Sequence, residues 1–378
     1  MSTLHVPDLT TIVDDRAVVI CCGTGGVGKT TAAAAIALEA ARRNRNACVV
    51  TIDPAKRLAN ALGLSELSDI PAEIGRDAWD PNHASTGHLS ALMLDSKSTF
   101  DRLVVRYAGD DEQSRRILDN RFYRNISGAL GGTQEYMAME KLHELHADGG
   151  YDVIVVDTPP TRHALDFVDA PDRLLRLLDN RVFRLLMMPT RAYLKVASMA
   201  VQTFLRTVSR VVGREVIEDI VAFFRAFEGM EAGFRERAAH VRELIADAGT
   251  AFVLVTTPRR DAVVEAEFFA QRLSDHSLEV EALIVNRIQP SFTDVDPSTL
   301  RAAAATMRPT DGDLASRYDL LAELETVAAR ERDELQQLRD RLPDANVALV
   351  PLLAQDVHDL PTLANVARHL FGAPDDGG

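Results

Sequence analysis

Short apolar runs separated by helical patterns are the main feature of this 378-residue sequence. The runs that predict strands are residues 17–22, 48–52, 88–94, 151–156, 251–256, 282–285 and 347–350. Strands that are apolar at successive positions are typical of a parallel sheet covered on both faces. The helical patterns that lie between the runs include residues 29–43, 261–273 and 313–341. Strands that alternate with helices predict a doubly wound, mostly parallel α/β domain.

Two stretches break this alternation because they contain helical patterns and no strand. In the second stretch, apolar residues recur at helical spacing, as at Phe234, Ala238, Val241, Leu244, Ile245 and Ala248. We therefore expect one helical subdomain, formed by insertions at residues 97–149 and 170–249, within a sheet domain that spans residues 17–372. Residues 1–16 and 373–378 are expected to be flexible tails.

The first apolar run leads directly into a glycine-rich turn and then into an alanine-rich helix. Gly23, Gly28, Lys29 and Thr30 match the P-loop pattern G-x-x-x-x-G-K-[ST]. Glycines let several backbone N–H groups converge on one phosphate, toward which the following helix directs the positive end of its dipole. An ordinary glycine-rich turn is the alternative, which the order of strand, loop and helix disfavours. The expected nucleotide-binding residues of this loop are Gly25, Gly26, Val27, Gly28, Lys29, Thr30 and Thr31.

Two carboxylates follow predicted strands and are expected near the same phosphates. Ligands of open parallel sheets bind at the carboxyl ends of the strands. Asp157 closes the run at residues 151–156, where an acid would help Thr30 hold Mg²⁺. Asp53 closes the second run, where a carboxylate could orient the water that attacks the γ-phosphate. Each aspartate could instead cap the turn that follows its strand, and the P-loop favours the functional interpretation.

The composition excludes several classes of protein. With 46% apolar and 26% charged residues, the chain resembles an ordinary globular protein. Its net charge of −14 argues against general affinity for nucleic acid, since no excess of Lys and Arg exists to displace counterions. No uncharged apolar run approaches the ~18 residues of a membrane span, and the first ten residues lack signal-peptide features. We therefore expect a cytoplasmic protein, for which a membrane-peripheral position remains open.

Five motifs, in the same order, resemble those of the anion-transporting ATPase family. This family includes the bacterial arsenite-pump ATPase and the eukaryotic ATPase that delivers tail-anchored proteins to membranes. The stronger motifs are G-G-V-G-K-T-T at residues 25–31, T-I-D-P-A-K-R-L at 51–58 and D-T-P-P-T-R-H-A-L at 157–165. The family has S-T-D-P-A-H-N-L and D-T-A-P-T-G-H-T-L at the last two. The weaker motifs are I-V-N at residues 284–286 and V-P-L-L-A at 350–354.

The resemblance implies an ATP- and Mg²⁺-dependent ATPase that works as a dimer with nucleotides at the interface. Lys29 and Asp53 would be catalytic, with Asp53 as the switch I carboxylate. Asp157 would begin switch II. The two weaker motifs would embrace the adenine, which adds Asn286 and Pro351 to the nucleotide site.

The chain departs from the family in three ways. The first lysine of the family's loop, which reaches the partner's nucleotide, is replaced by Thr24, and the glycine of P-T-G-H is replaced by Arg162. One hypothesis is that the Arg162 guanidinium supplies the missing charge. The three cysteines, Cys21, Cys22 and Cys48, cannot form a C-x-x-C zinc site, and we expect them to be buried thiols. A zinc-clasped homodimer and arsenite binding by thiolates are therefore not expected.

A basic segment at residues 180–214 is the best clue to a client. It holds seven basic residues and no acidic one: Arg181, Arg184, Arg191, Lys195, Arg206, Arg210 and Arg214. A basic amphipathic helix with methionines nearby suits a membrane surface or a hydrophobic helix in a groove. A lid helix that buries its apolar face within its own subdomain is the alternative.

The sequence is therefore consistent with two hypotheses about function. The first is a Mg²⁺-dependent ATPase whose dimer opens and closes to act on a hydrophobic client or a membrane-associated partner. The second is a weakly hydrolysing, nucleotide-binding subunit of an active paralogue, which Thr24 favours. We expect a homo- or heterodimer, with a lysine-bearing paralogue as the preferred partner and no nucleic acid. A partitioning ATPase is disfavoured by the helical insertions.

Overall fold

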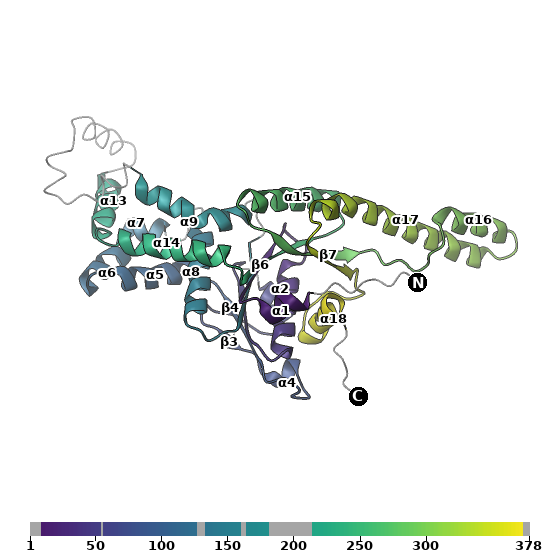
Figure 1. Ribbon diagram of the computed structural model, residues 1–378, viewed down its shortest axis with the longest axis horizontal. Coiled ribbons are helices and arrows are strands. Elements are labelled where there is room, and N and C mark those ends of the chain that lie inside the picture. The colour runs from purple at the N-terminus through teal and green to yellow at the C-terminus, as the bar shows by residue number, and fades with distance from the viewer. Residues whose placement is uncertain (1–8, 54–55, 127–132, 160–163, 181–213, 373–378) are drawn as a thin grey trace. The chain divides into compact units, whose positions relative to one another are not determined.

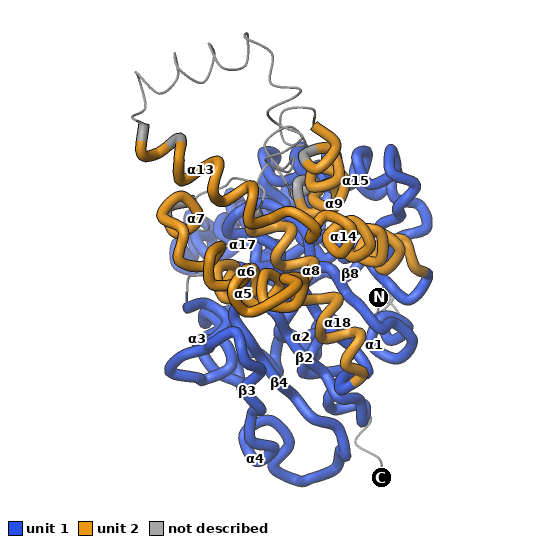
Figure 2. The backbone as a smooth tube through the Cα atoms, turned by 90° about the vertical axis from the view of Figure 1, so that its left-hand side faces the viewer, with its two compact units in different colours: residues 1–93, 150–165, 248–378 blue, residues 94–149, 166–247 orange. Residues whose placement is uncertain are grey.

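The computed structural model describes residues 9–53, 56–126, 133–159, 164–180 and 214–372. The chain forms two compact units (Figure 2). The sheet unit contains Met1–Met93, Gly150–Leu165 and Ala248–Gly378, and the helical unit contains Leu94–Gly149 and Asp166–Asp247. The insertions predicted at residues 97–149 and 170–249 lie close to the bounds of the helical unit.

The sheet unit is built on eight strands in the order β3-β4-β2-β5-β1-β6-β7-β8. Figure 1 shows β3, β4, β6 and β7 among them. All neighbouring strands pair in parallel except β3 and β4, which are antiparallel. The strands are β1 (Val18–Cys22), β2 (Asn46–Thr51), β3 (Ala72–Glu73), β4 (His88–Met93), β5 (Val153–Asp157), β6 (Thr250–Thr256), β7 (Val280–Ile288) and β8 (Asn346–Pro351). The predicted mostly parallel α/β fold is therefore confirmed. The sequence missed β3 because two exposed residues at an edge carry no hydrophobic pattern.

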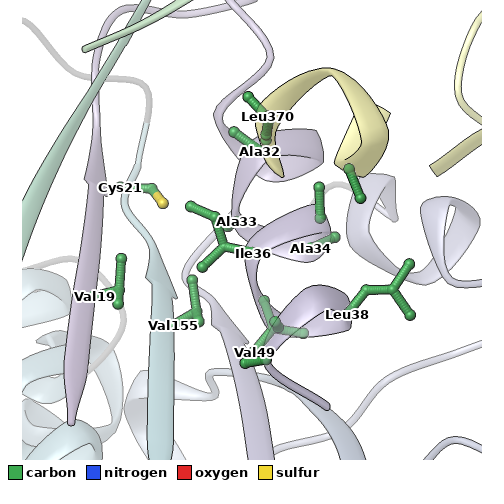
Figure 3. Close-up of a cluster of buried hydrophobic side chains, with 14 of the residues drawn as sticks. Val19, Cys21, Ala32, Ala33, Ala34, Ile36, Leu38, Val49, Val155 and Leu370 are labelled. Atoms are coloured by element: carbon green, nitrogen blue, oxygen red, sulfur yellow. The ribbon is translucent and has the colours of Figure 1, made fainter. Parts of the chain in front are cut away.

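The central strands are buried on both faces, as their continuous apolar runs predict. All five residues of β1 and all five of β5 are buried. Figure 3 shows side chains of one sheet face, among them Val19, Val49 and Val155, beside helix α2 (Lys29–Arg42). Seven alanines of α2 are buried, and their small side chains let the helix lie close to the sheet.

Helix α1 (Thr10–Asp15) corrects one prediction. Residues 1–16 were expected to be a flexible tail, but Leu9, Ile12 and Val13 are buried in the same core as α2. Arg16 then pairs with Glu281 at 3.0 Å. Residues 9–16 are mostly polar, and their three apolar side chains that reach the core are too few to form a clear pattern in the sequence. Residues 1–8 and the predicted tail at 373–378 lie outside the described residues.

The other helices of the sheet unit lie between its strands in sequence, except α18, which follows the last strand. They are α3 (Arg57–Ala61), α4 (Arg76–Trp79), α15 (Arg260–Asp275), α16 (Pro297–Met307), α17 (Gly312–Arg341) and α18 (Leu360–Phe371). The predicted helices at residues 261–273 and 313–341 correspond to α15 and α17. Helix α16 packs against α17, and α18 packs against α2.

In the residues of the helical unit that the structure describes, all regular secondary structure is helical. They are α5 (Ser96–Tyr107), α6 (Asp111–Leu118), α7 (Arg121–Ile126), α8 (Thr133–Ala147), α9 (Ala164–Asp179), α13 (Arg214–Ala226) and α14 (Glu231–Ala246). Within the described part of the chain, no helix of either unit is long and apolar enough to cross a bilayer.

Candidate functional site

A cavity of about 550 Å³ opens at the carboxyl ends of the parallel strands, beside the P-loop. We call it the P-loop cavity. Its walls come from the P-loop, from the ends of β2, β5, β7 and β8, and from α3 and α18. The residues that line it are Gly26, Gly28, Lys29, Thr30, Thr31, Asp53, Arg57, Asn60, Ala61, Asp157, Thr158, Asn286, Arg287, Pro351, Leu352, Leu353, Gln355, Asp356, Val357 and Val366. The predicted residues that lie on its wall therefore come from five separate stretches of sequence.

Two glycines shape the P-loop because no side chain could replace their hydrogen. Gly28 has a φ of 101°, and a Cβ there would lie 2.2 Å from the Asn286 side-chain nitrogen. Gly23 has a φ of 146°, and a Cβ there would lie 2.1 Å from the Val255 carbonyl oxygen. Both positions therefore require glycine for conformation and for space.

Gly25 and Val27 are the predicted P-loop residues that do not line the P-loop cavity. Val27 is 3% exposed and belongs to the hydrophobic core, so its side chain anchors the loop. Gly25 and Val27 line a second, smaller cavity of about 200 Å³ on the P-loop, with Thr24, Gly26 and others. Only their backbone groups could serve a phosphate.

Lys29 is buried at the first turn of α2. Its ammonium donates a hydrogen bond to the Thr24 carbonyl oxygen at 2.8 Å. Burial lowers the pKa of the Lys29 ammonium from its ordinary value, and the carboxylate of Asp157 opposes that shift. Since the loop uses the backbone of Thr24, Lys29 is positioned whatever side chain position 24 carries.

Asp157 lies at the centre of the site because strand pairing brings three elements together. It is paired in register with Cys21 of β1 on one side and with Thr51 of β2 on the other. The hydroxyls of Thr30 and Thr51 donate to its Oδ2 atom at 2.7 and 2.9 Å. Its other oxygen, Oδ1, is buried and has no hydrogen-bond partner among the described residues.

The Asp157 carboxylate is therefore poised for a cation. Burial raises its pKa, while the hydrogen bonds from Thr30 and Thr51 and the charge of Lys29 oppose the rise. A buried, half-satisfied carboxylate beside a hydroxyl offers the hard oxygen donors that Mg²⁺ prefers. These residues fit Mg²⁺, which would be held by Thr30 and Asp157 together with phosphate oxygens.

Asp53 follows β2 on the wall of the P-loop cavity. Its backbone N–H donates to the Thr51 hydroxyl at 3.2 Å, and its Oδ2 lies 3.4 Å from Nη1 of Arg57. Thr51 therefore bonds to the carboxylate of Asp157 and to the backbone of Asp53. Sequence reasoning missed Arg57, although its place four residues after Asp53, within the motif at residues 51–58, was the available signal.

Thr158 is a second residue that sequence reasoning missed. It is buried, and both its hydroxyl and its backbone N–H donate to the Cys21 carbonyl, at 2.8 and 3.3 Å. These bonds tie the residue after β5 to the end of β1, where the P-loop begins.

The two residues expected at the adenine, Asn286 and Pro351, both line the P-loop cavity. The Asn286 amide also donates to the Val27 carbonyl oxygen at 2.9 Å. Arg162 and nearly all of the basic segment at residues 180–214 lie outside the described residues.

Comparisons with known proteins agree with this geometry. Residues 16–307 match the family described as anion-transporting ATPase. The ATPase GET3 of Malassezia globosa is 25% identical over 369 residues, which cover 97% of this chain and 94% of the relative. The ATPase get3 of Aspergillus terreus is 23% identical over 360 residues, which cover 94% and 91%. The protein belongs to the anion-transporting ATPase family, and it is an ATP hydrolase.

Proposed function

We propose that this protein is a Mg²⁺-dependent ATPase that binds ATP in the P-loop cavity. The observation that supports it most strongly is the arrangement at Asp157. Two hydroxyls satisfy one carboxylate oxygen, and the other is buried without a partner among the described residues. A bound Mg²⁺ would neutralise part of the phosphate charge.

Each residue of the site has a separate role in this proposal. Lys29 binds the β- and γ-phosphates, and the backbone N–H groups of Gly26 to Thr31 cradle them. Thr30 and Asp157 hold the metal. Asp53 accepts a hydrogen bond from the attacking water and orients it toward the γ-phosphate. Asn286 and Pro351 contact the adenine.

The test is ATP hydrolysis by the full chain with Mg²⁺ and with the metal chelated. Lys29→Ala should lower ATP affinity by about 10- to 100-fold, because hydrogen bonds to charged groups contribute about 1.5–3 kcal/mol. Lys97→Ala is the matched control, since Lys97 is an exposed lysine that pairs with Asp101 in the helical unit. Hydrolysis that does not depend on Mg²⁺, or full ATP affinity in Lys29→Ala, would overturn the proposal.

We further propose that the ATPase works as a dimer and handles a hydrophobic client in the cytoplasm or at a membrane surface. The support is the similarity to the ATPase GET3 proteins over nearly the whole chain, and the basic segment at residues 180–214. A fluorescent peptide with about 20 apolar residues is a suitable probe. Binding that increases with ATP, and a dimer by light scattering, are expected. Equal binding of a peptide interrupted by charges would contradict a hydrophobic client.

A second candidate is a weakly hydrolysing subunit that pairs with an active paralogue. Thr24 favours it, because cations supplied across an interface contribute about 10³–10⁵ in rate. In that case the purified chain would bind ATP but turn it over slowly, and Thr24→Lys would increase turnover. A stable homodimer that binds two nucleotides and hydrolyses ATP rapidly would exclude this candidate.

A further inference from the structure

The end of β7 departs from regular strand geometry beside the P-loop. Asn286 pairs with Val350 of β8, and Ile288 pairs with Pro351, so that Arg287 is left over as a β-bulge. Arg287 also has a φ of 60°, in the left-handed region that residues other than glycine rarely adopt. Bulges redirect a side chain, and backbone strain of this kind concentrates at functional sites.

The bulge directs two neighbouring side chains to two successive carbonyl groups of the P-loop. The Asn286 amide donates to the Val27 carbonyl oxygen at 2.9 Å. The Arg287 guanidinium donates to the Gly26 carbonyl oxygen at 3.3 Å. In a regular strand, successive side chains point to opposite faces, so both residues could not reach one loop.

These contacts fix the orientation of two peptide planes. In a trans peptide, the carbonyl of one residue and the N–H of the next point in opposite directions. When the Arg287 guanidinium holds the Gly26 carbonyl toward β7, the N–H of Val27 in the same peptide therefore points away from β7. The Asn286 amide, which holds the Val27 carbonyl, directs the N–H of Gly28 away from β7 in the same way. These N–H groups belong to the loop that the P-loop pattern assigns to phosphate.

We propose that Asn286 and Arg287 are positioning residues of the phosphate cradle. They hold the Gly26–Val27 and Val27–Gly28 peptides with their N–H groups ready for the phosphates before nucleotide binds. Such preorganisation strengthens binding, because the loop loses less conformational freedom when the ligand arrives. The inference rests on the proposed function, since it takes the P-loop cavity to be the nucleotide site.

The surroundings of Arg287 support a contact with the loop as its role. Within the described residues, no carboxylate forms an ion pair with its guanidinium. Arg259 lines the same smaller cavity, but it pairs with Asp261 at 2.7 Å within its own turn. Arg259 therefore provides a matched arginine that does not hold the P-loop.

The test compares Arg287→Asn with the control Arg259→Asn in the full chain. Asparagine tolerates the left-handed conformation, so the thermal midpoint should stay unchanged while the guanidinium is lost. ADP affinity should fall about fivefold, as the loss of one hydrogen bond predicts, and adenosine affinity should not change. The KM for ATP should rise in proportion, with kcat changed by less than about twofold. Arg287→Lys, which keeps a charged donor, should recover part of the loss.

Two results would overturn the inference. The first is parental ADP affinity in Arg287→Asn. The second is an equal loss of ADP and adenosine affinity, because that would place the defect at the base. Failure of the proposed function would look different, since the parent chain would then bind neither ADP nor ATP.

Discussion

The two units place a buried, partly satisfied carboxylate in different surroundings. In the sheet unit, Asp157 is 1% exposed and keeps one oxygen without a partner among the described residues, at the wall of a cavity. In the helical unit, Glu140 of α8 and Arg237 of α14 form an ion pair with side chains that are 2% and 8% exposed. The first carboxylate is left incomplete where a ligand can reach it. The second likewise keeps one buried oxygen, Oε2, without a hydrogen-bond partner among the described residues, but its charge is paired with another side chain of its own unit.

The material around the two carboxylates also differs. Hydroxyls on a strand and on the first turn of a helix surround Asp157, and short backbone segments fix them. The helical unit instead packs large aromatic rings, whose centroids lie 5.2–6.4 Å apart: Phe100, Tyr123, Phe223, Phe227 and Phe234. The role of a buried charge therefore depends on where it lies in the fold. At strand ends it can serve chemistry, and inside a helical bundle it fixes packing.

The largest expected effect is a loss of ATP turnover at the site of the sheet unit, whose fold should stay intact. Asp53→Asn should lower kcat by about 10²–10⁴, the usual contribution of a positioned general base, with ATP affinity unchanged. Steady-state hydrolysis and ATP titration measure the two quantities. Asp77→Asn, an exposed aspartate of α4, is the control. Parental turnover in Asp53→Asn would refute the catalytic assignment.

The next effect tests the ion pair of the helical unit. Arg237→Met should destabilise the protein by about 3–5 kcal/mol, because it leaves the Glu140 carboxylate buried and unpaired. The double variant Glu140→Leu, Arg237→Met should regain most of that loss. Urea unfolding followed by circular dichroism measures both. If the double variant were as unstable as the single one, the helical unit would need this pair for more than neutralisation.

A smaller effect is expected when Asp157 is replaced by Asn. Removal of a buried charge should stabilise the nucleotide-free protein against unfolding by about 0.5–2 kcal/mol. The variant's ATP hydrolysis should no longer increase with Mg²⁺. Because the pKa of Asp157 is raised on folding, the folded parent binds its proton more tightly than the unfolded chain. Its stability should therefore fall as pH rises through that raised pKa. If the free energy of unfolding changed with pH in the same way in the parent and in Asp157→Asn, the pH dependence could not come from Asp157.

The smallest effect concerns His143, on α8 in the helical unit. Burial, assisted by Arg237 and His240, lowers its pKa to about 4 from the ordinary 6.5. The unfolded chain then binds the proton more readily, so stability is complete above about pH 6.5 and falls as pH drops toward 4. The expected change is below about 1 kcal/mol, since solvent screens a half-buried group. Amide hydrogen exchange in α8 should reveal it, and His143→Gln should abolish it.

Most strands could be predicted from the sequence, whereas several site contacts could not. The continuous apolar runs located seven of the eight strands because burial on both faces demands them. The P-loop was readable because its glycines and the following helix are contiguous. Arg57 and Thr158 lie inside the motifs at residues 51–58 and 157–165, but their roles were missed because the contacts that define them, with Asp53 and with the Cys21 carbonyl, form in the folded chain.

The sequence by itself determined the mostly parallel α/β fold, the P-loop and the family. Each of these depends on short-range features, namely hydrophobic periodicity, glycine conformation and contiguous motifs. Only the tertiary structure decided which distant residues meet. Thr30 and Asp157, 127 positions apart, share a hydrogen bond because β1 and β5 pair in register. The bulge that brings Arg287 to the P-loop likewise arises from the pairing of β7 with β8, since strand register depends on contacts between segments and not on either segment alone.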